Sequence, residues 1–253
     1  MGPVDMSPCT CTEPTGLERL RYFPRQLLTA DDMRAEQEYF REKQRRHNRL
    51  LHGWGVVCGL EVVPDPKAGP LAVSVCPGYA LGPFGDEIYV PEPVKLDLSY
   101  CARPPAVECS PKYAVSQPLV TSPMLVMIRY VECPTRPMRT LPAGCGCDET
   151  ACEYSRTRDG FEIKCMLKPS EEASSAETVP PTICATERDK RHKLQKCPPC
   201  PTDHWVLLAT IVPLREKGGG SVTLGPNSID NSTRRIVYSS VAIQEQLILC
   251  CCK

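Results

Sequence analysis

Cysteine is the residue type in this sequence with the clearest potential for chemistry. The chain has 17 cysteines in 253 residues. Cys145, Cys147 and Cys152 form a C-x-C-x4-C pattern, and Cys197 and Cys200 form C-P-P-C. A structural zinc ion takes about four ligands, and closely spaced cysteines commonly supply them in pairs. These two groups could therefore meet at one zinc ion that ties a long loop to the core.

Two other states of the cysteines stay open at this point. The thiols could remain unpaired, or they could form disulfides after release from the cell, although an odd number cannot all pair within one chain. C-P-P-C also has the spacing of thiol oxidoreductases, but the sequence around it does not predict the βαβ unit that such a motif requires. A metal- or thiol-dependent enzyme that uses the Cys145–Cys200 cluster is therefore an alternative hypothesis.

The rest of the sequence carries no recognisable catalytic motif. It contains neither G-x-x-x-x-G-K-S/T nor G-x-S-x-G, and its four histidines are scattered. His47 and His52 are five residues apart, which misses the i,i+4 spacing of a helical metal site. We therefore predict a protein that is not an enzyme, with no catalytic residues and with structural zinc as the sole candidate cofactor.

One long amphipathic helix is the strongest predicted element. Thr29 is a suitable N-cap, and Asp32 completes a capping-box variant. Nothing from Ala30 to Leu51 breaks a helix. Acidic residues lead and basic residues follow, which complements the helix dipole.

A narrow seam of larger side chains runs along this helix. Met33, Phe40 and His47 follow one another at intervals of seven, and Leu51 lies one turn further on. The seam could belong to an ordinary docked helix with a solvated face, or it could pack against a neighbouring subunit. Trp54, between two glycines, is predicted to be the packing core of the elbow that follows.

Short strands dominate the remainder, so the predicted fold class is α+β: one long N-terminal amphipathic helix followed by a mainly antiparallel, proline-rich, short-stranded β domain. The strands are expected at 56–63, 71–75, 79–81, 87–91, 94–98, 124–131 and 205–212, with a cysteine-rich excursion over 145–165. The predicted division is a flexible arm (1–16), the helix and glycine-tryptophan elbow (17–63), the β domain with its cysteine-rich loop (64–165), a charged loop or linker (166–203), and a returning strand with the C-terminal segment (204–253).

Charge and hydropathy exclude two classes of partner. Thirty basic residues balance thirty acidic ones, which argues against a nucleic-acid-binding protein. No stretch approaches the roughly 18 apolar residues of a membrane helix, and the first 25 residues lack the apolar region of a secretory signal. We expect synthesis in the cytoplasm without membrane insertion.

The block LRYFPRQLLTADDMRAEQEYFREKQRRHNRLLHGWGVVCGLEV (20–62) resembles an uncharacterised bacterial family associated with phage-tail-like and contractile injection system baseplates. LAVSVCPGYALGPFGDEIYVPEPVKLDL and CEYSRTRDGFEI are similar to the same proteins. The resemblance implies a baseplate or fibre-attachment component, present in multiple copies in a virion or tail-like particle, whose partners are other subunits. A surface-binding adhesin is a further alternative.

Overall fold

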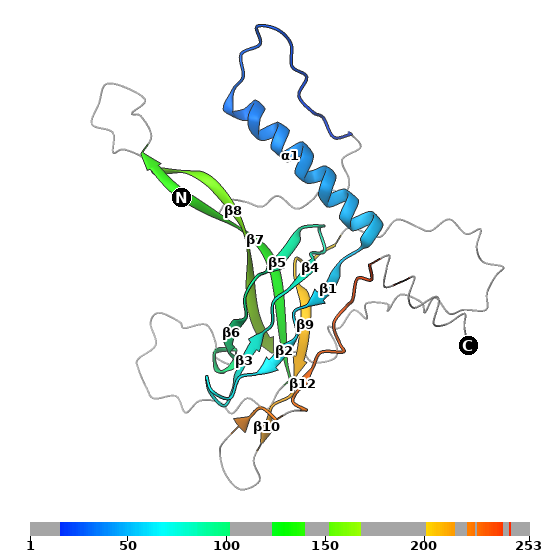
Figure 1. The fold of residues 1–253 in the computed structure, drawn as a ribbon, viewed down its shortest axis with the longest axis vertical. Helices are drawn as coiled ribbons and strands as arrows, with labels where there is room; N and C mark the ends of the chain where they lie inside the picture. The colour runs from blue at the N-terminus through cyan, green and yellow to red at the C-terminus, as the bar shows by residue number, and fades with distance from the viewer. Residues whose placement is uncertain are drawn as a thin grey trace, which may run out of the picture.

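The structure, a computed structural model, describes residues 16–101, 123–139, 152–167, 201–215, 222–225, 227–239 and 243. These residues form one long helix and a set of mainly antiparallel sheets, which confirms the α+β class. Figure 1 shows the strands gathered in a β body from which the helix and a two-stranded ribbon project. Much of 1–16 and 166–203 lies outside the described residues, so the predicted domain division stays a prediction.

Helix α1 (Ala30–His47) begins at the predicted capping box. The Thr29 hydroxyl accepts from the Asp32 N–H at 3.1 Å, and the Asp32 carboxylate accepts from the Thr29 N–H at 2.8 Å. The helix continues as a π-helical turn, η1 (Asn48–His52), and ends at Gly53, whose φ of 78° suits glycine. The predicted extent is therefore confirmed, with a wider last turn than expected.

Six short strands form two three-stranded sheets. The first has the order β1-β4-β5 and the second β2-β3-β6. Their bounds are β1 (Gly55–Gly59), β2 (Val62–Pro64), β3 (Ala72–Val75), β4 (Gly78–Leu81), β5 (Glu87–Val90) and β6 (Val94–Asp97).

The prediction of a single strand over 56–63 is wrong, because β1 and β2 belong to different sheets. The chain leaves the first sheet at Gly59 and Leu60, which have φ angles of 64° and 54°. A Cβ on Gly59 would lie 2.1 Å from the Pro77 carbonyl oxygen, so this crossing needs glycine. Leu60 then turns fully into the core.

The longest strands form a four-stranded sheet with the order β12-β9-β7-β8. Its bounds are β7 (Met124–Arg139), β8 (Cys152–Leu167), β9 (Val206–Ile211) and β12 (Ile229–Asp230), and β10 (Leu214–Arg215) pairs separately with β11 (Val222–Thr223). The expected excursion over 145–165 is wrong from Cys152 onward, since those residues are strand. β9 pairs with β7 only as far as Ile128, so beyond that point β7 and β8 continue as the projecting ribbon.

The core lies between the sheets and excludes the helix. Its fully buried side chains come from all three of the larger sheets and from the turns beside them: Leu60, Val73, Val75, Ile88, Leu98, Met124, Ile128, Leu208 and Ile211. Burying one such side chain stabilises a fold by about 1.5–3 kcal/mol. None of the described residues of α1 is buried, so the helix draws no such stabilisation from the core.

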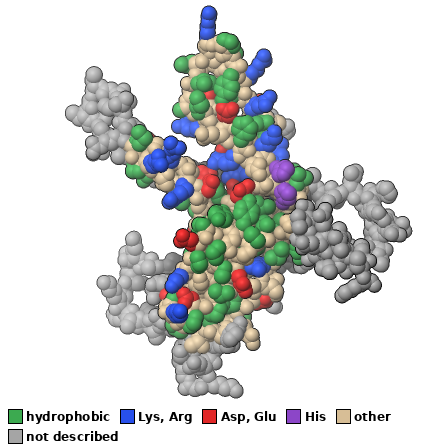
Figure 2. Space-filling view, viewed as in Figure 1, with side chains coloured by type: hydrophobic (Ala, Val, Ile, Leu, Met, Phe, Trp, Pro, Cys, Tyr) green, Lys and Arg blue, Asp and Glu red, His purple; other side chains and the backbone are tan. Residues whose placement is uncertain are grey.

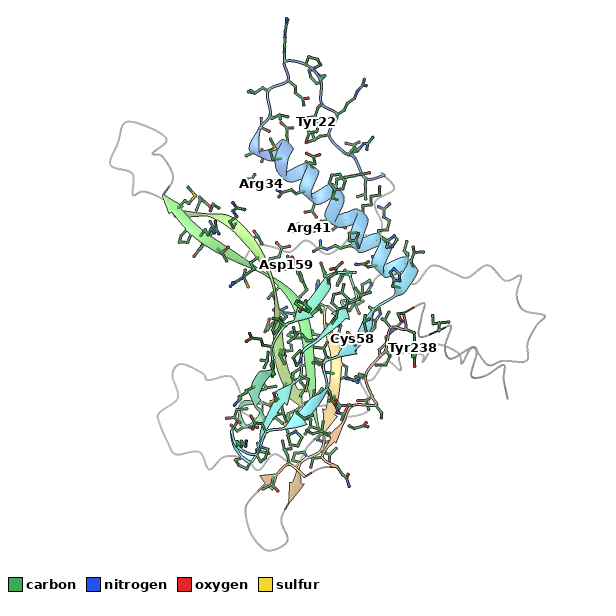
Figure 3. All side chains as sticks on the ribbon, in the orientation of Figure 1. Tyr22, Arg34, Arg41, Cys58, Asp159 and Tyr238 are labelled. Atoms are coloured by element: carbon green, nitrogen blue, oxygen red, sulfur yellow. A yellow bond between two sulfur atoms is a disulfide. The ribbon has the colours of Figure 1, made fainter. Side chains whose placement is uncertain are left out.

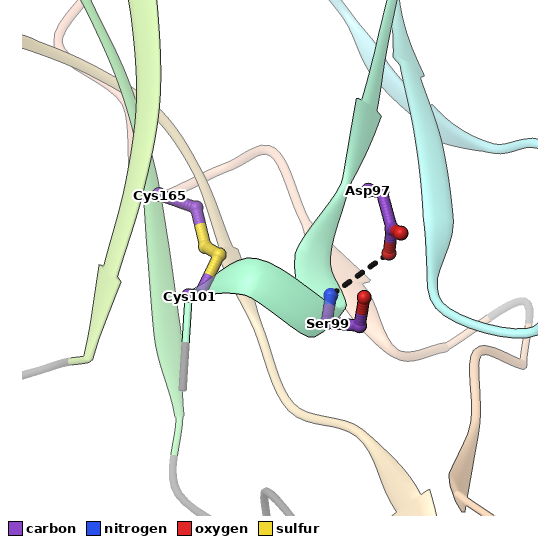
Figure 4. Close-up of a disulfide and its surroundings, with 4 residues drawn as sticks. All are labelled: Asp97, Ser99, Cys101 and Cys165. Carbon is purple, nitrogen blue, oxygen red and sulfur yellow. Dashed lines mark hydrogen bonds between the residues drawn. A yellow bond between two sulfur atoms is a disulfide. The ribbon is translucent and has the colours of Figure 1, made fainter. Parts of the chain in front are cut away.

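A disulfide between Cys101 and Cys165 joins the turn after η2 (Leu98–Tyr100) to β8 (Figure 4). Asp97 caps η2 by accepting from the Ser99 N–H at 2.9 Å. The two Cα atoms are 5.5 Å apart and 64 residues separate them in sequence. Of the states left open for the cysteines, this pair adopts the disulfide, and neither member belongs to the predicted zinc set.

Candidate interaction surface

Most of the predicted zinc ligands fall where the structure gives no description. Cys145, Cys147, Cys197 and Cys200 lie outside the described residues, and Cys152 is the first residue of β8. Within the described part of the chain, no group of three or more His, Cys, Asp or Glu side chains is arranged to hold a metal. The zinc site stays a prediction.

The predicted seam of α1 lies on the surface. Met33 and Phe40 are 48% and 58% exposed, His47 is exposed, and Leu51 on η1 is 69% exposed. Trp54 is half-buried against the core, with the Arg235 guanidinium 4.5 Å from its ring centroid. The elbow residue therefore contacts the β body, whereas the seam residues remain accessible.

Further exposed apolar residues precede the helix, and the sequence analysis missed them. They are Tyr22, Phe23, Leu27 and Leu28, all exposed. Tyr22 hydrogen-bonds Glu36, so this segment folds back along α1, and that bond raises the pKa of Tyr22. The sequence does show two pairs of large apolar residues here, Tyr22-Phe23 and Leu27-Leu28, in a stretch without helical periodicity. Such a pattern could have indicated an exposed apolar segment.

The π-helical turn brings together two side chains that an α-helical spacing would separate. His47 and His52 have ring centroids 5.4 Å apart. A π-helical turn closes at i+5, which places such a pair on one face. A sequence pattern based on i,i+4 could not have found it.

Polar contacts attach the C-terminal end of the helix to the β4–β5 turn. The Arg45 Nε lies 2.6 Å from the Asp86 carboxylate, and these side chains are only 14% and 13% exposed. Burial alone would lower the pKa of Arg45, but hydrogen bonds and charge from Glu42 and Asp86 outweigh it and raise that pKa. The buried Asn48 donates to the Gly85 carbonyl oxygen at 2.9 Å. The attachment is thus specific and largely shielded from water.

A second contact joins the helix to the base of the ribbon. Arg41 pairs with Glu132 of β7 at 2.5 Å. Beside it, the Tyr130 hydroxyl donates to Asp159 of β8 at 2.6 Å. Burial and then this hydrogen bond raise the pKa of Tyr130, so the phenol stays neutral. Figure 3 shows Arg41 and Asp159 near the point where helix and ribbon meet.

Beyond this contact the helix and the ribbon leave a cleft of about 830 Å³ between them. Its lining residues come from α1 and from both ribbon strands: Gln37, Arg136, Met138, Tyr154, Ser155, Arg156 and Thr157. Figure 2 shows Lys and Arg side chains on the ribbon and along the helix. The surface of the two projections therefore combines exposed apolar side chains on the helix with a polar, basic cleft beside it.

Comparison with known proteins gives limited information. No protein-family model matches the sequence, and a search of curated proteins finds no match. A solved structure described as the crystal structure of TssK aligns with 83% of this chain at 11% identity and a TM-score of 0.34. The chain covers 41% of the TssK chain. A similarity this low carries no argument about fold or function. Among the described residues, no helix is long and apolar enough to cross a membrane.

Proposed function

We propose that this chain is a non-enzymatic structural subunit of a phage-tail-like contractile particle, acting as a baseplate or fibre-attachment component. Its partners are other subunits of that assembly. The observation that carries the proposal is the exposed helix α1 with its apolar seam, together with the sequence resemblance of 20–62.

An exposed helix of this kind gains from a partner. In proteins most helical stability comes from packing an apolar face against a neighbouring surface. The polar contacts of α1 with the β body and the ribbon lie in its C-terminal half and beyond, at Arg41, Arg45 and Asn48, so its N-terminal half stands away from the core. A subunit that covered Met33 and Phe40 would add the missing apolar contact.

The proposal includes a structural zinc ion held by four of the five predicted cysteines, Cys145, Cys147, Cys152, Cys197 and Cys200. Native mass spectrometry under reducing conditions, with metal analysis on the same sample, tests this part. A whole-number ratio of zinc to chain supports it, and a metal-free chain contradicts it.

The assembly role is tested by particle incorporation. A tagged chain replaces the natural copy in its source organism, and particles isolated by ultracentrifugation are analysed by quantitative mass spectrometry. We expect the wild-type chain to be present in the particles at a constant ratio to the major particle protein. The variant chain with Phe40→Asp and Leu51→Asp should be absent from the particles. Tyr89→Asp is the matched control, because Tyr89 on β5 is 67% exposed but lies outside the helix. A wild-type chain that never sediments with particles would refute the proposal.

A further inference from the structure

We propose that the cleft between α1 and the β7–β8 ribbon binds an acidic, extended segment of a neighbouring protein subunit. The inference rests on the proposed function in so far as the neighbour is a subunit of the same particle. It adds the site of contact and the chemistry of the partner.

The cleft is basic and lacks a matching acid. Arg136 and Arg156 both line it, and none of its described lining residues is acidic. Neither guanidinium forms an ion pair with a described residue. Other arginines of the two projections differ in this respect: Arg41 and Arg45 pair with glutamates and Arg129 pairs with Glu162. Arg46 on the helix and Arg158 on the ribbon, like the two cleft arginines, form no ion pair with a described residue. What distinguishes Arg136 and Arg156 is that both line the same cleft, with no acidic residue among its lining residues.

The other lining groups suit a carboxylate-bearing ligand. A guanidinium binds a carboxylate through two parallel N–H donors. Gln37, Tyr154 and Thr157 add an amide and two hydroxyl groups that can donate to the same ligand. Met138 and Tyr154 are more than half exposed and offer apolar surface beside the charges. Acidic side chains and the apolar stems next to them would both find contacts here.

The backbone conformation at Arg136 is a second, independent sign of a functional position. Its φ is 58°, a left-handed conformation that costs a non-glycine residue energy. The strand pairing passes from Thr135–Arg156 to Pro137–Tyr154 without a pair at Arg136. Ser155 Oγ donates to the Arg136 carbonyl at 3.0 Å and holds this geometry. Strain of this kind at a ribbon position that lines the cleft favours a role in binding.

A protein segment fits these features better than a nucleic acid. The net charge of the chain is zero, so no overall positive field would attract a polyanion. Among the described strands β8 pairs only with β7, so its outer edge can accept the backbone of an extended peptide.

Fluorescence anisotropy of the purified full-length chain with a labelled octaglutamate peptide tests the inference, at about 10 mM salt to limit screening. We expect saturable binding that weakens about tenfold or more in Arg136→Gln/Arg156→Gln, since charged hydrogen bonds are lost. Arg158→Gln is the matched control, because Arg158 is exposed on the same strand but does not line the cleft. Its effect should stay below about twofold. If the double variant misfolds by circular dichroism, Arg156→Gln alone takes its place with the same expected direction.

Three results would overturn the inference. They are the absence of saturable binding, equal weakening by Arg158→Gln and the cleft variants, and tighter binding of an oligothymidylate of equal charge than of octaglutamate. The outcome is separable from that of the proposed function. A chain that sediments with particles but does not bind octaglutamate would remove the cleft inference alone, whereas binding without incorporation would remove the assembly role.

Discussion

Replacing Asp86 with asparagine should release helix α1 from the β body without unfolding the sheets. Asp86 is the β-body partner of Arg45, and both side chains are about 13–14% exposed. Removing one partner of a fully buried pair costs about 3–5 kcal/mol, because the other charge is left uncompensated. Glu42 still accepts from Arg45 at 2.7 Å, so part of that cost is offset. We therefore expect a loss of about 2–3 kcal/mol in the attachment.

This loss should appear as local opening, since α1 has no buried residue to hold it in place. A change of about 2–3 kcal/mol raises the population of the detached helix roughly 30- to 140-fold. A detached helix loses its contacts with the β body, so its amide hydrogens should exchange faster by a similar factor. Hydrogen exchange followed by mass spectrometry resolves peptides of α1 from peptides of the core strand β9.

Arg34→Gln provides the matched control on the same helix. Arg34 pairs with Asp31 at 2.5 Å, but these side chains are 75% and 88% exposed. Such a pair contributes about 0.5 kcal/mol or less, so exchange in α1 should change by no more than about twofold. The reasoning is refuted if Asp86→Asn leaves exchange in α1 unchanged, or if exchange in α1 and β9 rises together.

Two further predictions concern the β body. The double variant Cys101→Ala/Cys165→Ala should lower the free energy of unfolding by about 4 kcal/mol, because loop-closure entropy gives this value for a separation of 64 residues. Chemical denaturation of the variant and of the oxidised wild type measures the difference, and an unchanged midpoint would contradict the prediction. Burial, followed by the charge and hydrogen bond of Glu87, raises the pKa of Tyr79 to about 12. The phenol of Tyr79 ionises at lower pH in the unfolded chain than in the folded one. The stability that the neutral Tyr79 contributes to the fold is therefore complete below pH 10.0 and is lost as the pH rises to about 12. The urea midpoint of unfolding should fall over that pH range. Tyr79→Phe should reduce this fall, and an identical fall in the variant would exclude Tyr79 as its source.

The sequence was sufficient where local chemistry decides the structure. The capping box at Thr29 and Asp32 depends on side chains three residues apart, and it forms as predicted. The stop at Gly53 follows from the φ that only glycine adopts readily. The strand alternation around β3 to β6 also needs only short-range information, and these strands lie within a residue or two of the predicted ranges.

The sequence was insufficient where distant residues decide. The apolar run at 56–63 reads as one strand, but packing of Leu60 in the core divides it between two sheets. The extension of β7 to Arg139 crosses Pro134 and Pro137, which normally argue against a strand. Because β9 stops at Ile128, a proline nitrogen that faces that edge of β7 deprives no described strand of an N–H donor. This accounts for one of the two prolines, since residues three apart in a strand face opposite edges. Nor could spacing alone have paired Cys101 with Cys165 across 64 residues.

The direct connection from α1 through the elbow to β1 determines how the molecule would bear mechanical load. β1 is held along both edges, by β4 on one side and by hydrogen bonds between Val56 and the backbone of Arg235 and Val237, each 2.8 Å long, on the other. Backbone hydrogen bonds in an antiparallel pair lie across the strands. A tension applied to the helix along β1 would therefore load these bonds together in shear, rather than opening them one at a time. The helix is thus joined to the β body in the orientation that best resists a lengthwise pull.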